Sequence, residues 1–275
     1  MAGSWPATPE HMRLPRVHAP VRVTLDQSPL GLATLYADIG RELLAAGTRT
    51  DALRAVTGVA VTRIPGVEWA SITEGIHGRF STVAETDARA RQADEIQYEL
   101  GTGPCVDAIL NNTTFRTGRL ESDERWPEFS RRASEAFGVH SMLSFRLYLE
   151  DDSRIAGLNL YSTSPEAMDN TAETIGTLVA THGAAVIAAA TAREQATQLK
   201  TALVNSREIG MSMGVLMATY KLTRKQAFDL LRVASQKTNR KLTDIATDVV
   251  DTGTLDLPSD RRNRRSTGGR SQSPA

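Results

Sequence analysis

Cysteine is nearly absent from this 275-residue chain, and other features that would place it outside a reducing compartment are missing as well. The single cysteine, Cys105, excludes an intramolecular disulfide. No run approaches 18 consecutive apolar residues, so we predict no contact with a membrane. The Pro-rich N-terminus lacks the apolar centre of a secretory signal. Together these absences predict a cytoplasmic protein.

Signatures of catalysis are also missing. The five histidines are scattered and form no pair at metal-ligand spacing. There is no GxxxxGK[ST] phosphate loop and no GxSxG nucleophile turn, and Gly101-Thr102-Gly103-Pro104 lacks the third glycine of a dinucleotide fingerprint. We therefore expect no enzyme, no cofactor and no metal. A small-molecule enzyme in the first domain stays an alternative that only turnover by that domain would support.

Charge is balanced overall but unevenly distributed, with 32 Lys+Arg against 32 Asp+Glu. Residues 1–204 carry 19 basic and 25 acidic side chains, whereas residues 205–252 carry 8 and 5, and residues 259–275 carry 5 and 1. A basic C-terminal part favours contact with nucleic acid or another polyanion. We interpret residues 1–28 as a disordered leader and 258–275 as a disordered basic tail.

Residues 29–192 show the pattern of an α+β domain. Helical spacing predicts helices over 30–47, 51–64 and 88–98, with Gly47 as a left-handed cap of the first. A glycine turn and a short helix follow at LGTGPCVDAIL (100–110). Strand patterns cover 67–72 and 80–83, as a hairpin, and then 141–149 and 155–161, joined through the acidic turn Glu150–Asp152. An antiparallel sheet flanked by helices is the predicted fold.

Three motifs in this domain carry a resemblance: IQYELGTGPCVDAI (96–109), ERWPEF (124–129) and SMLSFRL (141–147). With the order of elements, they resemble a GAF domain of the type found in actinobacterial regulators, over about residues 30–190. The resemblance implies a sensor for an unknown small-molecule or protein signal. A GAF domain that only mediates dimerisation is the alternative.

Cys105 and Trp126 each lie within one of these motifs. Cys105 begins a helix, where the helix dipole lowers a thiol pKa and favours redox sensing. Free cysteine is also among the most buried residue types, which favours packing beneath the turn. We expect Trp126 to cover the core rather than to bind a ligand.

A proline-free, alanine-rich stretch from Thr171 to Tyr220 predicts one continuous helix about 75 Å long. Small and apolar residues at alternating steps of three and four form a heptad seam from Ile175 to Met217. Its C-terminal part consists of Leu199, Leu203, Ser206, Gly210, Met213 and Met217. We predict a parallel homodimer, in which this coiled-coil helix pairs with its copy.

Residues 193–257 combine the end of that helix with two shorter amphipathic helices. One covers 224–236, and the other starts after Thr238-Asn239 and stops at Gly253. Thr223 and Gln226 match a capping box. Seven cations and one amide suit phosphate contact and base-edge reading: Lys221, Arg224, Lys225, Arg232, Lys237, Asn239, Arg240 and Lys241. Tyr220 and Phe228 fit either a hydrophobic core, the more common use of aromatics at helical spacing, or stacking on bases.

This last segment resembles an ANTAR domain over nearly its whole length. The matching residues are Ile209, Gly214, Leu216-Met217, Ala227-Phe228, Leu231-Arg232, Ala234-Ser235, Asn239-Arg240-Lys241-Leu242, Ile245-Ala246 and Val249-Val250. The resemblance implies a dimeric RNA-binding module that acts on stem-loops in nascent transcripts. Ser212-Met213-Gly214 departs from the Ala-Lys-Gly of many members, so no RNA contact is assigned there.

The sequence thus predicts an α+β GAF-type sensor domain joined by a long helix to an all-α three-helix ANTAR domain. The predicted function is a signal-responsive transcription regulator that binds RNA hairpins and suppresses termination. A DNA-binding transcription factor with a helix-turn-helix head is the alternative, and preference for duplex half-sites would distinguish it.

Overall fold

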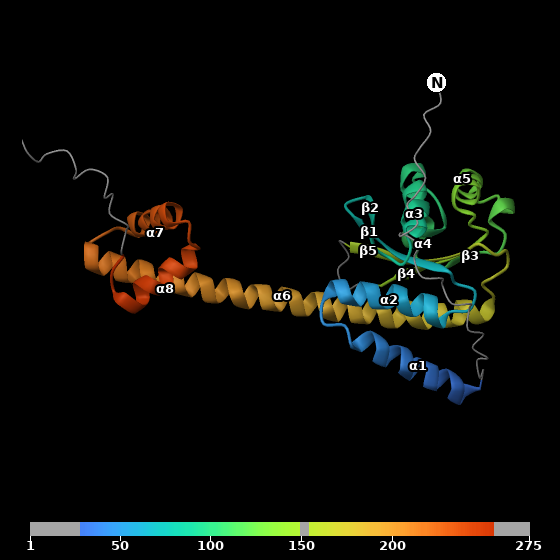
Figure 1. Ribbon diagram of the computed structural model, residues 1–275, viewed down its shortest axis with the longest axis horizontal. Helices are drawn as coiled ribbons and strands as arrows, with labels where there is room; N and C mark the ends of the chain where they lie inside the picture. The colour runs from blue at the N-terminus through green and yellow to red at the C-terminus, as the bar shows by residue number, and fades with distance from the viewer. Residues whose placement is uncertain (1–27, 149–153, 256–275) are drawn as a thin grey trace, which may run out of the picture. The chain divides into compact units, whose positions relative to one another are not determined.

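The computed structural model describes residues 28–148 and 154–255 (Figure 1). The predicted basic tail, the acidic turn Glu150–Asp152 and the predicted leader up to residue 27 lie outside these residues. The elements are, in chain order, α1 (Pro29–Leu44), α2 (Arg49–Arg63), β1 (Trp69–Ile76), β2 (Arg79–Glu85), α3 (Ala88–Leu100), α4 (Pro104–Asn111), β3 (Phe115–Thr117), a 3-10 turn (Leu120–Ser122), α5 (Pro127–Phe137), β4 (Ser141–Leu147), β5 (Arg154–Ser162), α6 (Asn170–Tyr220), α7 (Arg224–Thr238) and α8 (Leu242–Thr252).

The five strands form one antiparallel sheet in the order β2-β1-β5-β4-β3. The predicted hairpin is confirmed as β1 and β2, which pair through Ile76 and Arg79. His77 and Gly78 close it, both with positive φ, 50° and 77°. Such a turn matches the right-handed twist of the strands. β4 and β5 are central strands, as predicted.

Side chains alternate across the sheet because successive strand residues point to opposite faces. On one face, Leu143 and Leu158 pack with α1, α2 and the first part of α6 in one hydrophobic cluster. On the other face, Met142 and Tyr161 pack with α3, α4 and α5. Figure 1 shows the sheet between these two helical layers. The predicted α+β class is confirmed.

α6 is a single helix of 51 residues, so the predicted unbroken helix is confirmed. Two glycines bring it close to its neighbours. A Cβ atom at Gly176 would lie 2.4 Å from the Phe145 ring, and one at Gly183 would lie 2.8 Å from Val56 Cγ2. Glycine at both positions therefore permits close packing against β4 and α2.

By length and composition, α6 is apolar enough to cross a membrane, and 44% of its most apolar 18-residue window is buried inside the structure. A helix in a protein core has the same composition. α6 contributes Ile175, Val179 and Ile187 to the first hydrophobic cluster. Its apolar character is thereby explained by packing within the domain.

The prediction of a left-handed cap at Gly47 is wrong. α1 ends at Leu44 with a right-handed Ala45, and Gly47 is not among the positive-φ glycines. The reason is the start of α2, where Thr48 and Asp51 form a capping box. Only residues 45–48 connect the two helices, and the last of them, Thr48, is the extended cap of α2, so the chain passes directly from one helix into the next cap.

The sequence pattern predicts neither β3 nor α5. β3 has only three residues and pairs with β4 at the sheet edge. α5 begins at Pro127, directly after Trp126, which is 3% exposed and donates its indole N–H to Asp107 Oδ2 at 2.6 Å. Trp126 therefore covers the core, as expected.

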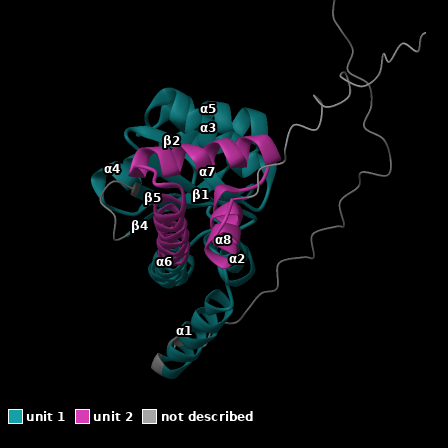
Figure 2. Ribbon diagram, turned by 90° about the vertical axis from the view of Figure 1, so that its left-hand side faces the viewer, with its two compact units in different colours: residues 1–194 teal, residues 195–275 magenta. Residues whose placement is uncertain are grey.

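The chain divides into two compact units, residues 1–194 and 195–275 (Figure 2). The second unit has its own core, in which Leu216 of α6, Leu231 of α7 and Val249 of α8 meet. The predicted capping box of Thr223 and Gln226 begins α7, and Gly253 ends α8 in the left-handed conformation. This unit is the predicted all-α three-helix head.

Candidate functional site

The core of the second unit leaves its cations outside. α7 buries Ala227, Leu231 and Ala234, which share one side of the helix because they are four and three residues apart. All eight side chains predicted to contact RNA are exposed: Lys221, Arg224, Lys225, Arg232, Lys237, Asn239, Arg240 and Lys241. We call these residues the basic surface.

Two cations of the basic surface already have partners. Arg232 lies 3.3 Å from Asp229, and Arg240 lies 2.7 Å from Asp248 Oδ2 on α8. The hydrogen bond to Asp248 raises the pKa of Arg240. Exposed ion pairs of this kind contribute little to stability, because water screens the charges, so an anionic ligand can replace the carboxylate at little cost.

The other five cations have no ion-pair partner within residues 28–148 and 154–255: Lys221, Arg224, Lys225, Lys237 and Lys241. Their charges are not neutralised locally and remain available to an anion. A surface with this many unpaired cations suits binding to a polyanion.

Two ordered turns present part of the basic surface. Lys221 precedes α7 with φ 56°, and Asn239 ends α7 with φ 51°. The backbone N–H of Asn239 donates to the Ser235 carbonyl, and Ser235 Oγ donates to the Arg240 carbonyl at 2.7 Å. These bonds fix the backbone that carries Asn239, Arg240 and Lys241.

The two aromatic residues of the head lie outside its core. Phe228 is 42% exposed and Tyr220 is 45% exposed. Of the two alternatives that the sequence allows for these residues, the structure therefore does not show packing in the hydrophobic core.

The residues of the predicted dimer seam also lie largely at the surface of the second unit. Leu199 and Leu203 are 62% and 63% exposed, Met217 is 36% exposed, and Ser206 and Gly210 are exposed. Met213 differs, because it is half-buried against the three-helix core. The three-helix core begins at this level of α6, where Ile209 and Leu216 also pack into it.

A buried polar cluster lies between the sheet and α3 in the first unit. Its centre is Asp94 of α3, which is 0% exposed. Asp94 Oδ1 accepts hydrogen bonds from Tyr161 Oη at 2.5 Å and from Asn159 Nδ2 at 2.8 Å, and Oδ2 accepts one from Thr82 Oγ1 at 2.8 Å. Two strands, β5 and β2, thus contribute donors to one carboxylate of α3. Tyr98 of the same helix bonds to Thr73 of β1 and to Thr82.

Burial raises the pKa of Asp94 to about 6, although the hydrogen bonds from Tyr161, Ser71, Thr82 and Asn159 oppose this rise. Loss of water disfavours the charged carboxylate, and the donors compensate only in part. Asp94 therefore titrates close to neutral pH, unlike an ordinary aspartate.

Cys105 lies in the same interior and is 0% exposed. Burial raises the pKa of its thiol to about 12, and the nearby Asp94 adds to this rise. Its backbone N–H donates to Gln97 Oε1 at 2.8 Å, which ties the start of α4 to α3. A protonated, enclosed thiol agrees with packing rather than with redox sensing.

The sequence reasoning missed Asp94 and Asn159. Two signals were present: Asp94 shares a helix face with Ala90, Ala93 and Gln97, all buried, and Asn159 interrupts the apolar strand IAGLNLY. In the part of the chain that the structure describes, no group of three or more His, Cys, Asp or Glu side chains is arranged to hold a metal ion.

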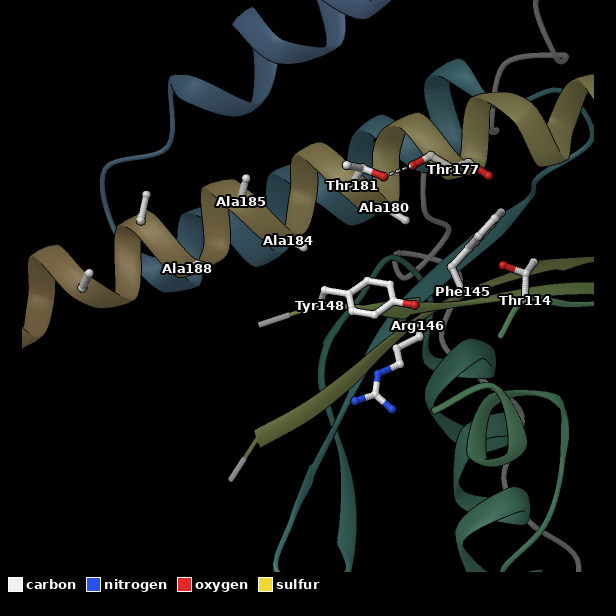
Figure 3. Close-up of a pocket in the computed structure, with 12 residues that line it drawn as sticks. Thr114, Phe145, Arg146, Tyr148, Thr177, Ala180, Thr181, Ala184, Ala185 and Ala188 are labelled. Atoms are coloured by element: carbon white, nitrogen blue, oxygen red, sulfur yellow. Dashed lines mark hydrogen bonds between the residues drawn. The ribbon is translucent and has the colours of Figure 1, made fainter. Parts of the chain in front are cut away.

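A groove of about 530 Å³ lies between α6 and the end of β4 (Figure 3). Alanines and two threonines of α6 line one side, with Phe145 and Tyr148 opposite. The Arg146 side chain points away from α6, and its Nη1 donates to the Ile109 carbonyl at 2.5 Å. Among the residues that the structure describes, the groove therefore offers methyl and aromatic surface, and its one charged lining residue, Arg146, is directed away from α6.

Comparison with known families agrees with both resemblances. The GAF domain family matches residues 46–188, more than half of the chain, and the ANTAR domain family matches residues 197–250. No curated protein matches the chain. The resemblance to the GAF domains of actinobacterial regulators in particular remains a prediction.

Solved structures share the fold of the first unit at low sequence identity. The GAF domain of an Acinetobacter phosphoenolpyruvate-protein phosphotransferase is 19% identical with a TM-score of 0.45, over 60% of this chain and 96% of that one. The photosensory core module of Stigmatella aurantiaca phytochrome is 13% identical with a TM-score of 0.50, over 79% of this chain and 45% of that one. Type II free methionine-R-sulfoxide reductase from Thermoplasma acidophilum is 16% identical with a TM-score of 0.40, over 56% of this chain and 94% of that one. These likenesses concern the fold alone.

The domain pairing points to regulation rather than catalysis. The chain belongs to the regulators that join a GAF sensor domain to an ANTAR domain.

Proposed function

We propose that this protein is a cytoplasmic, signal-responsive transcription regulator. It binds RNA stem-loops in nascent transcripts through its ANTAR domain and suppresses termination under the control of its GAF domain. The observation that carries the proposal is the basic surface, with five exposed cations that lack an ion-pair partner among the described residues.

The small size of the head supports a nucleic-acid partner. Its core consists of a few residues around Leu216, Leu231 and Val249, so its solubility does not require eight Lys and Arg side chains in residues 205–252. Phosphates attract such a surface over a distance of about 10 Å at ordinary ionic strength. The exposed aromatics favour RNA with unpaired bases, because duplex bases are already stacked.

A parallel homodimer through α6 is part of the proposal. Leu199 and Leu203 leave most of their surface in water, and they are one helical turn apart on the same side. Pairing with a second copy would bury both side chains and bring two ANTAR heads together. Two heads suit a pair of stem-loops.

We propose that a small molecule or a protein signal acts on the GAF domain by shifting this dimer equilibrium. Such a shift requires different affinities of the signal for the two states. The groove beside α6 supports this coupling, because its lining includes α6 itself, the helix that carries the dimer seam.

The test is a salt-titrated binding assay with the purified full-length protein. One probe is a pool of hairpin RNAs with a fixed stem and a randomised loop, and the other is duplex DNA with the stem sequence. We expect tighter binding to the hairpin pool, enrichment of particular loops, and weaker binding at higher salt. Equal or tighter binding to the duplex would contradict the proposal and favour promoter control.

A further inference from the structure

Phe228 is placed on the wrong side of α7 for a core residue. The helix packs through Ala227, Leu231 and Ala234. Phe228 follows Ala227 and is turned by about 100° from it, so its ring faces outward. Its exposed fraction is 42%. Burial of a phenylalanine ring stabilises a protein, and the head forgoes part of this contribution.

Cations flank the ring along the same face. Arg224 lies four residues before Phe228 and Arg232 lies four residues after it, so each is one helical turn away. Both side chains are exposed. Lys225, next to Arg224, is exposed as well and has no ion-pair partner within the two described ranges.

An aromatic ring between two cations matches the chemistry of a nucleotide in a single strand. The base offers a flat face to the ring, and the phosphates on its two sides carry the charges that the cations attract. A base inside a duplex is stacked on its neighbours and does not reach such a ring. The arrangement therefore selects unpaired nucleotides.

We propose that Phe228 stacks on an unpaired base of the RNA loop, while Arg224 and Arg232 contact the phosphates beside that base. This inference rests on the proposed function, and it adds the residue that distinguishes loop from stem. Arg232 leaves Asp229 for the phosphate when RNA binds. Phe228 thus supplies preference for the loop, and the cations supply general affinity.

The experiment compares full-length wild type, Phe228→Ala, Phe228→Leu and Phe228→Tyr. The probes are the tightest hairpin recovered from the randomised-loop pool, its blunt stem duplex, and versions of the hairpin with one loop base removed at each position in turn. Val233→Ala is the matched control, since Val233 is 37% exposed on the same helix but lies about 140° from Phe228. Circular dichroism checks that each variant keeps its helices.

We expect Phe228→Ala and Phe228→Leu to bind the hairpin roughly 10-fold or more weakly, whereas Phe228→Tyr retains binding. Their salt dependence should stay that of wild type, because no charge is removed. Removing one particular loop base should weaken wild type but not Phe228→Ala.

Two results overturn the inference in distinguishable ways. If wild type prefers no hairpin to the duplex, the proposed function falls and the stacking inference falls with it. If wild type prefers the hairpin and Phe228→Ala binds it as tightly, or loses hairpin and duplex binding equally, only the stacking inference falls.

Discussion

Asp94 is the residue whose chemistry departs most from its ordinary behaviour. It is a carboxylate with no exposed surface, held by donors from Tyr161, Asn159 and Thr82. Such a network stabilises one arrangement of strand and helix only while every donor finds its acceptor. The interior beneath α3 is therefore specified by polar contacts as well as by packing.

Replacement of Asp94 by asparagine should change how stability depends on pH. The pKa of Asp94 is about 6 in the folded protein, above the unfolded value of about 3.9. Between these values the folded state holds a proton that the unfolded state has lost, so folding stability falls as pH rises from about 4 to about 6. The difference is roughly 3 kcal/mol, because one unit of pKa corresponds to about 1.4 kcal/mol.

The measurement is urea unfolding of wild type and Asp94→Asn at several pH values from 4 to 7. The variant should gain on wild type by roughly 3 kcal/mol across that range, because the other carboxylates cancel in the difference. Asp94→Ala is the control: it leaves three buried donors without an acceptor and should lose stability at every pH. Parallel curves for wild type and Asp94→Asn would contradict the raised pKa.

Cys105 should resist modification in the folded protein. Its thiol has no exposed surface, and burial raises its pKa to about 12, so almost no thiolate is present at neutral pH. We expect a thiol-reactive dye to label the native protein much more slowly than a cysteine peptide, and to label it fully in denaturant. Native labelling at the rate of the peptide would restore the redox interpretation.

The N-terminal part of helix α6 packs within the first unit, whereas its later part exposes apolar side chains. Its sheet side needs Gly176 and Gly183 for close packing, and these positions have no free space for a side chain. Further along, Leu199 and Leu203 are exposed although they are apolar. Burial of Leu199 and Leu203 requires another molecule, which is the reason to expect a dimer.

Introduction of charge at the exposed pair should separate the protomers. Leu199→Asp with Leu203→Asp places four carboxylates in the proposed interface of the dimer, and we expect a monomer by light scattering at concentrations where wild type is a dimer. Val204→Asp is the matched control, because Val204 is 52% exposed but lies outside the seam. If all three proteins have the same mass, the seam is not an interface.

Helices and strands with long, regular patterns could be predicted from the sequence. α2, α3, α6 and α7 have capping residues or periodic apolar faces, and β4 and β5 are apolar runs. β3 is too short for a pattern, and it forms because β4 offers an edge. Local preference predicts a left-handed cap at Gly47, but the cap at Thr48 determines the backbone there.

The basic surface could be predicted from the sequence, whereas the Asp94 cluster could not. Exposed cations of the head could be predicted, since charge is visible in the sequence and a small helical unit has little interior. The Asp94 cluster could not, because Thr82, Asp94 and Asn159 are brought together only by sheet pairing and helix packing. Likewise, the ion pair between Arg240 and Asp248 depends on how α7 and α8 meet.

Charge along the entire chain separates sensing from binding. Residues 1–204 carry an excess of six acidic side chains, and residues 205–252 carry an excess of three basic ones. All lysines of the chain follow residue 199, and four of them, Lys221, Lys225, Lys237 and Lys241, belong to the basic surface. Under the proposed function, the acidic first part would repel RNA, and the basic head would attract it.

Single lysine replacements in the full-length protein test this division. Lys225→Ala and Lys241→Ala should each weaken hairpin binding across all loop sequences and reduce the slope of log affinity against log salt by about 1, since each removes one phosphate contact. Lys200→Ala is the matched control, with the same loss of charge on α6 before the three-helix core. It should leave the slope unchanged. If all three variants keep the slope of wild type, the RNA does not lie on the basic surface. A changed slope for Lys200→Ala alone would place the RNA along the seam of α6.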